Sequence, residues 1–286
     1  MKSIGIICLL LFLVYQYYRS KYKLQCSKYM IRTQKVQEKI RIVHLTDLHS
    51  NRFGKDNEKL VNMIREQSPD LVCCTGDMLN ASGSSEVFLK LVRKLSEEFP
   101  VYISMGNHEI AFEEKHGQDL NDSIHKAGGI VLDFDYKDIS IKGAKIRIGG
   151  CYGYGFPGNC DIMPEDEGER KFLERFQKTE DCKILLSHAP YGWYRMDSLD
   201  YWDLDLVLAG HTHGGQIRLP FIGGLYAPDI GLLPGRENGL YYSRDEKKVL
   251  VLSRGLGSSE WVPRMNNVPE VVVVELWPGE SAENGR

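Results

Sequence analysis

Apolar runs with the length of buried strands recur along this chain, and polar residues follow their ends. Five such runs stop directly before a motif whose side chains can bind a metal. These motifs are Asp47-Leu48-His49, Gly76-Asp77, Gly106-Asn107-His108-Glu109, His188 and Gly210-His211-Thr212-His213. Because ligands of α/β proteins bind outside the carboxyl ends of strands, the pattern predicts one site at the tips of one sheet.

The spacing of apolar residues between these runs predicts alternating strands and helices. Positions at helical spacing indicate helices at 56–65, near 88–95 and, in a more polar form, near 118–126. From residue 130 onward, short runs with short connections indicate antiparallel strands. The succession is typical of a four-layer α/β/β/α sandwich, in which helices flank two mixed sheets.

The N-terminal segment has a different character. Residues 4–18 are nearly all apolar or aromatic, and basic residues follow them. A membrane span needs about 20 apolar residues, so this run is short for one unless its tyrosines lie at the interface. Three interpretations are a single-pass anchor, a cleaved signal peptide and a buried core helix. The poor cleavage site and the basic residues after the run favour an anchor in the cell membrane, with the body on the cytoplasmic side.

The chain therefore divides into four expected segments. Residues 1–23 form the membrane anchor, and the polar, basic residues 24–39 form a tether or an amphipathic surface strand. One folded domain spans 40–276, and 277–286 are a tail.

Composition narrows the function. With 42% hydrophobic residues, the 286-residue chain is able to bury a sizeable core. The net charge of -3 argues against a nucleic-acid partner, since such proteins usually carry a basic excess. Seven cysteines, an odd number with Cys73 and Cys74 adjacent, indicate reduced core thiols rather than a disulfide framework.

The strand-end side chains form a mixed set of ligands. Carboxylates, imidazoles and one amide oxygen suit Mn, Fe, Zn or Co better than Mg or Ca. The candidate ligands are seven: Asp47, His49, Asp77, Asn107, His188, His211 and His213. Seven are too many for one tetrahedral ion, but they suit two ions that share a bridging carboxylate. Two such ions acidify a water and clamp the attacking and leaving oxygens, which is the chemistry of phosphoester hydrolysis.

Each motif taken alone also has a structural explanation. His188 alone fits a core histidine, Gly76-Asp77 a turn, and Gly106-Asn107-His108-Glu109 a helix cap. Their occurrence in order, each after an apolar run, favours one shared site. The remaining histidines outside the motifs are taken as structural: His44, His116 and His125.

The five motifs in order resemble those of the calcineurin-like metallophosphoesterases over residues 40–276. The extended Gly210–Gln216 stretch, the apolar N-terminus and the late loop with Arg254 and Arg264 resemble a branch of membrane-associated bacterial phosphodiesterases. Some relatives in that branch hydrolyse the pyrophosphate of UDP-2,3-diacylglucosamine.

The resemblance implies a role for each motif residue. Two sets of three would each hold one ion, namely Asp47, His49 and His213 for the first, and Asn107, His188 and His211 for the second. Asp77 would bridge the ions. His108 would protonate the leaving oxygen or stabilise the phosphoryl charge. Glu109 stands where the family often has aspartate, and would orient His108.

Three further residues are expected to contact the substrate. Asn80 would reach the substrate or a metal-bound water. Arg254 and Arg264 lie in a late loop, and the planar guanidinium suits phosphate. The alternative for both arginines is a surface position.

These observations predict a dinuclear phosphoesterase that acts by attack of a metal-bridging hydroxide. The resemblance to the bacterial branch implies that the bond cleaved is a phosphodiester or a pyrophosphate. The divalent ions would be Mn, Fe or Zn. The substrate would be lipid-linked or a nucleotide, and no protein partner follows from the sequence. The alternatives are a protein phosphatase of the same superfamily and a non-catalytic metal-binding scaffold. The presence of every expected ligand argues against the scaffold.

Overall fold

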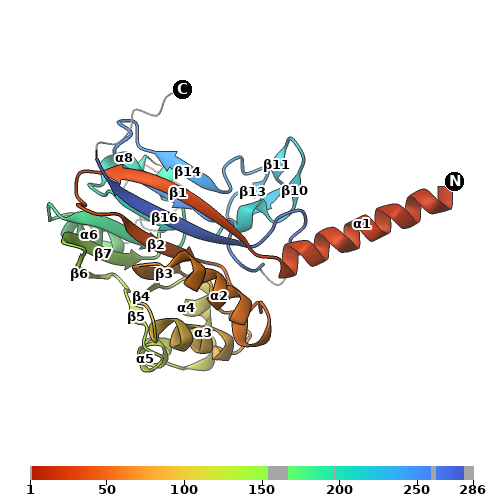
Figure 1. Ribbon diagram of the computed structural model, residues 1–286, viewed down its shortest axis with the longest axis horizontal. Coiled ribbons are helices and arrows are strands. Elements are labelled where there is room, and N and C mark those ends of the chain that lie inside the picture. The colour runs from red at the N-terminus through yellow and green to blue at the C-terminus, as the bar shows by residue number, and fades with distance from the viewer. Residues whose placement is uncertain (1, 154–166, 196, 259–261, 280–286) are drawn as a thin grey trace.

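The computed structural model describes residues 2–153, 167–195, 197–258 and 262–279. Two six-stranded mixed sheets pack face to face, and helices cover their outer faces (Figure 1). The predicted α/β/β/α sandwich of four layers is confirmed. One hydrophobic core lies between the two sheets and another lies between the first sheet and its helices. Side chains of β2 (Ile40–Leu45) contribute to both, because Ile40 and Ile42 face the other sheet while Val43 and Leu45 face the helices.

The first sheet has the order β1-β16-β2-β3-β4-β5. Its strands are β1 (Gln25–Thr33), β16 (Glu270–Pro278), β2, β3 (Leu71–Thr75), β4 (Val101–Ser104) and β5 (Ile130–Val131). β2 to β5 run parallel to one another, and β16 runs antiparallel to β2. The outer face of this sheet is covered by four helices: α2 (Glu58–Gln67), α3 (Glu86–Ser96), α4 (Asn107–His116) and α5 (Leu120–Lys126).

The second sheet has the order β14-β15-β9-β8-β7-β6. Its strands are β14 (Gly239–Tyr242), β15 (Val249–Leu252), β9 (Leu206–Ala209), β8 (Cys182–Ser187), β7 (Ala144–Cys151) and β6 (Asp135–Ile141). The central four are parallel, and β6 and β14 pair antiparallel at the edges. Its outer face packs against α6 (Glu167–Phe176), α7 (Tyr191–Arg195) and α8 (Ser198–Tyr201).

Short elements complete the loops around the sandwich. They are the 3-10 turns η1 (Lys55–Asn57) and η2 (His213–Gly215) and two small ribbons, β10 (Arg218–Leu219) with β11 (Gly223–Gly224) and β12 (Tyr226–Ala227) with β13 (Gly231–Leu232). The polar helix expected near 118–126 corresponds to α5. The preceding α4 was not predicted, because it begins within the motif that was taken as a strand end.

The N-terminal segment differs from its prediction. α1 (Lys2–Tyr22) is a single helix that projects from the body (Figure 1), and its apolar side chains, such as Ile4 and Leu10, are exposed. Within the described ranges, no helix combines the length and the apolar character that a bilayer span requires. The expected single-pass anchor and cell-membrane localisation are therefore wrong, because the last turns of α1 carry Gln16, Arg19 and Lys21. The buried core helix is also wrong.

Of the two alternatives for 24–39, the structure has the surface strand. β1 pairs in parallel with β16 over its whole length, from Gln25 with Glu270 to Thr33 with Pro278. The folded body thus includes residues N-terminal to Ile40.

Candidate metal centre

The strand-end residues meet at one buried place between the edges of the two sheets. They come from the loops after β2, β3 and β4 of the first sheet and after β8 and β9 of the second. They are Asp47, His49, Asp77, Asn107, His108, His188, His211 and His213. The site was expected at the tips of one sheet. It is instead shared by two, because β8 and β9 pair with each other and not with β2 to β4.

The loops that carry these side chains have unusual backbone conformations. The φ angle is 51° at Asp47, 54° at Asp77 and 69° at His211, in the left-handed region that L-residues rarely adopt. Each such residue costs about 1–3 kcal/mol unless its surroundings hold it. Gly210 lets the loop after β9 approach the loop after β2 closely, since a Cβ there would overlap with Thr46 and Asp47. His49 and His213 also have positive φ angles, so five of the residues that present ligand atoms share this conformation.

A first group of potential ligand atoms comprises Asp47, His49, Asp77 and His213, which lie within 4.8 Å of one another. All four residues are buried. The Nδ1 of His49 donates to Asn80 Oδ1 at 2.9 Å, which leaves the lone pair on Nε2. Among the described residues, that Nε2 and the Nδ1 of His213 are buried without a hydrogen-bond partner. A buried imidazole nitrogen without a partner, such as His49 Nε2 in this group, suits a bound cation.

A second group comprises Asp77, His188 and His211. His188 donates from Nδ1 to the Thr75 carbonyl at 2.8 Å, so in the neutral ring the lone pair is on Nε2. Around this Nε2 lie His211 Nδ1 at 3.0 Å, Asn107 Oδ1 at 3.2 Å and Asp77 Oδ2 at 3.3 Å. The Nε2 of His211 is 2.7 Å from Asp229 Oδ2, to which it donates. Two ring nitrogens and two side-chain oxygens thus converge. The other ring nitrogens of His188 and His211 donate elsewhere, which is the arrangement of a metal site.

Asp77 faces both groups. Its Oδ2 lies 3.6 Å from His49 Nε2 and 3.3 Å from His188 Nε2. Burial opposes its ionisation, but His188 and His49 hold the pKa of this carboxyl well below its usual range. Burial also lowers the pKa of His188, yet Asp77 and Asp47 outweigh it and raise that pKa to about 9. One ionised carboxylate between two sets of imidazoles suits a pair of divalent ions.

His108 lies beside the first group. Its ring is perpendicular to that of His49, with centroids 4.6 Å apart. The backbone N–H of Ala81 donates to His108 Nδ1 at 3.2 Å. This contact places the proton of the neutral ring on Nε2, where it is available to an oxygen of a bound substrate.

The expectation that Glu109 orients His108 is wrong. Its buried carboxylate instead accepts from the backbone N–H groups of Asp77 and Met78 at 2.7 Å, of Gly106 at 2.8 Å and of Leu79 at 3.2 Å. Glu109 therefore ties together the loops after β3 and β4. Burial and the nearby Asp77 raise its pKa to about 7.

The three residues expected at the substrate have other contacts. Asn80 bonds to the ring of His49 and donates to its backbone carbonyl at 3.2 Å. Arg254 pairs with the buried Glu270 at 3.0 Å. Arg264 is itself buried and donates to the carbonyls of Arg254 and Gly257, both at 2.7 Å. Their contact with a substrate stays a prediction.

Two residues of the site were missed in the sequence. Asp229 orients His211 from the turn between the two-residue strands β12 and β13, and Asn267 donates to the His213 carbonyl at 2.7 Å. Neither follows an apolar run, so no local pattern marks them. Both support a ligand residue from loops that are distant in sequence.

Comparison with known proteins bears on the same residues. A model of the calcineurin-like phosphoesterase family matches residues 40–215, which contain all five motifs. The chain is 31% identical to the uncharacterized metallophosphoesterase YkuE of Bacillus subtilis, over 82% of this chain and 78% of that one. It is 26% identical to YkoQ of the same organism, also described as an uncharacterized metallophosphoesterase, over 84% of each chain.

A further relative is the phosphodiesterase YaeI of Escherichia coli, 28% identical over 82% of each chain. These relatives do not support the finer placement in a membrane-associated branch. Since the family match spans more than half of the chain, the protein belongs to the calcineurin-like phosphoesterases and is a metal-dependent phosphoester hydrolase.

Proposed function

We propose that the protein hydrolyses phosphodiester or pyrophosphate bonds at a site for two divalent ions. The observation that carries this proposal is the convergence of acceptor atoms on two sides of Asp77, with the ring protons of His49, His188 and His211 directed away. In this proposal, one ion is held by Asp47, His49 and His213 and the other by Asn107, His188 and His211. Asp77 contributes to both.

The ligand set favours Mn, Fe or Zn, because imidazole nitrogens outnumber the oxygens that Mg or Ca prefer. When bound, the two ions would supply an acidified water and neutralise the charge on the phosphoryl group. The protein residues orient these parts. Thr75, Asn80 and Asp229 fix the tautomers of His188, His49 and His211.

His108 is the proposed catalytic residue. With Nδ1 held by the Ala81 amide, its Nε2–H is a donor for the leaving oxygen. A positioned donor or general acid of this kind contributes about 10²–10⁴-fold in rate. Diester or pyrophosphate cleavage is preferred to monoester cleavage because the relative YaeI is described as a phosphodiesterase. The substrate would be lipid-linked or a nucleotide.

The test is hydrolysis by the full chain after metal removal, with Mn, Fe, Zn, Mg or Ca added back singly. We expect Mn, Fe or Zn to restore cleavage of bis-p-nitrophenyl phosphate more than of the monoester. His108→Ala should lower the rate by about 10²–10⁴-fold without changing metal content. His116→Ala is the matched control, since His116 is exposed at the other end of the same helix.

Other outcomes would contradict the proposal. A higher rate on phosphopeptides than on any diester would identify a protein phosphatase. Binding of two ions without turnover of any phosphoester would indicate a non-catalytic scaffold. Full activity in His108→Ala would remove this residue from the reaction.

A further inference from the structure

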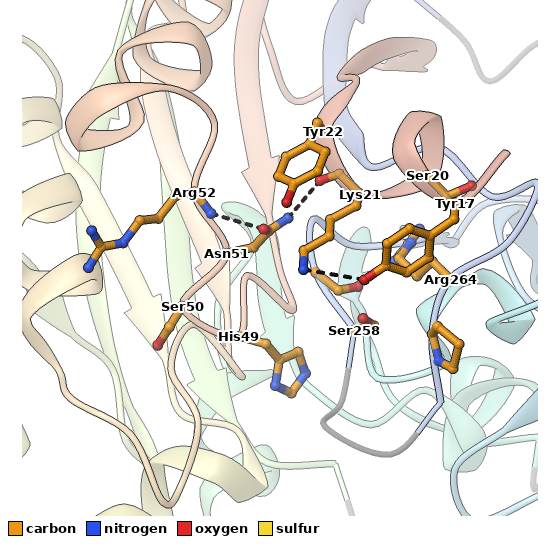
Figure 2. A pocket seen from close by; sticks show the side chains of 12 residues that line it. Tyr17, Ser20, Lys21, Tyr22, His49, Ser50, Asn51, Arg52, Ser258 and Arg264 are labelled. Carbon is orange, nitrogen blue, oxygen red and sulfur yellow. Dashed lines mark hydrogen bonds between the residues drawn. The ribbon is translucent and has the colours of Figure 1, made fainter. Parts of the chain in front are cut away.

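A pocket of about 490 Å³ opens beside the metal centre, at His49. One of its walls is the C-terminal end of α1, which contributes Tyr17, Lys21 and Tyr22 (Figure 2). The loop after β2, with residues 49–52, and the late residues 257–258 and 263–264 contribute most of the rest. The segment that follows the apolar run of the sequence therefore lies next to the candidate active site.

Hydrogen bonds hold the end of α1 in this position. Ser20 is fully buried, and its Oγ accepts from the backbone N–H of Asn267 at 3.1 Å. The side chain of Asn267 donates in turn to the carbonyl of His213 at 2.7 Å. Asn51 donates from Nδ2 to the carbonyls of Lys21 and Leu256, both at 3.1 Å. The pocket wall is thus connected directly to a metal-ligand loop.

The described lining of the pocket carries positive charge. No aspartate or glutamate is among the described residues that line it. The Lys21 ammonium lies 3.4 Å from the hydroxyl of Tyr17, and that hydrogen bond raises the pKa of Lys21 despite partial burial. Arg264 is buried at the other side and bonds to neutral oxygens alone within the described ranges. Figure 2 shows Arg52 turned away, so Lys21 and Arg264 supply the positive charge among the described lining residues.

We propose that this pocket is a subsite for an anionic arm of the substrate, a phosphate-bearing group next to the scissile phosphoester. The Lys21 ammonium and the Tyr17 hydroxyl, which both reach over the space beside His49, would bind its oxygens (Figure 2). The inference rests on the proposed function, because the scissile phosphate is placed at the metal centre. Lys21 is then a specificity-determining residue supplied by the N-terminal helix.

Two p-nitrophenyl esters test the subsite with the same leaving group. Both carry the p-nitrophenyl group on the 5′-phosphate of thymidine. The second, an ester of thymidine 3′,5′-bisphosphate, has in addition a free 3′-phosphate as its anionic arm. We expect the full, metal-loaded chain to prefer the bisphosphate ester by about tenfold in kcat/KM, mainly through KM. Lys21→Ala should remove most of this preference, mainly by raising KM for the bisphosphate ester. Lys23→Ala is the matched control, because Lys23 is exposed two residues later and does not line the pocket.

Calorimetry makes the test independent of turnover. Thymidine 3′,5′-bisphosphate should bind the wild-type chain about tenfold tighter than it binds Lys21→Ala, and Lys23→Ala should match the wild type. If neither ester is cleaved but this difference in binding is present, the proposed function fails and the subsite stands. If both esters are cleaved equally and Lys21→Ala binds like the wild type, the subsite is refuted and the proposed function stands.

Discussion

His211 depends on a carboxylate that the sequence pattern does not mark. Asp229 accepts from its Nε2 at 2.7 Å and so leaves Nδ1 as the ligand atom. We expect Asp229→Ala to weaken the binding of one of two Mn ions by about 10–100-fold, as loss of such a partner typically does. Titration calorimetry of the metal-free chain would resolve the two sites.

The control for this prediction is Asp245→Ala. Asp245 accepts from Ser243 and from the Lys247 amide near the β14–β15 turn, away from the ligand loops. Equal Mn affinities in the wild type and both variants would show that Asp229 does not position His211.

At the scale of elements, β1 is part of the sandwich although it precedes the matched family region. It pairs with β16 along nine residues, and Ser27 donates to the buried Glu270 that also holds Arg254. Deletion of residues 2–33 should therefore lower the free energy of unfolding by about 1 kcal/mol for each ladder bond that is lost. Urea unfolding measures this change.

Deletion of residues 2–13 is the comparison, because exposed side chains such as Ile4 and Leu10 bury little area on the body. We expect its urea midpoint to match that of the full chain. An equal loss of stability in both deletions would mean that the start of α1, and not β1, supports the fold.

The same elements indicate how far local patterns reach. The helices α2 and α3 were predicted because their buried faces, such as Leu60 with Ile64 and Phe88 with Val92, recur at helical spacing. α4 was missed because its start coincides with the Asn107-His108 motif. Sheet membership was not predictable, since β3 and β8 are similar apolar runs whose partners are chosen over long distances.

At the scale of the whole molecule, the candidate ligands come from loops of both sheets, so bound ions would link the two sheets. Each ion that binds the folded chain alone, at 100 times its Kd, adds about 2.7 kcal/mol of stability. For a chain of this size, we expect the Tm to rise by roughly 5–10 °C for each ion. Differential scanning calorimetry with and without Mn measures the rise.

Asp77→Asn should lose most of this stabilisation, because its carboxylate faces both ligand groups. Asp122→Asn, an exposed change on α5, should keep it. A full rise in Asp77→Asn would place the stabilising ions elsewhere.

The sequence by itself determined the kinds of ligands, their order and their place after apolar runs. Periodicity is local, so the layered α/β fold could be predicted from it, and the motifs in order carried the resemblance to the metallophosphoesterase family. Only the tertiary structure decided that two sheets share the site and that Asp229 and Asn267 support it. It also decided that the end of α1 walls the pocket. These contacts join residues up to hundreds of positions apart, such as Ser20 with Asn267, and depend on packing that no local pattern encodes.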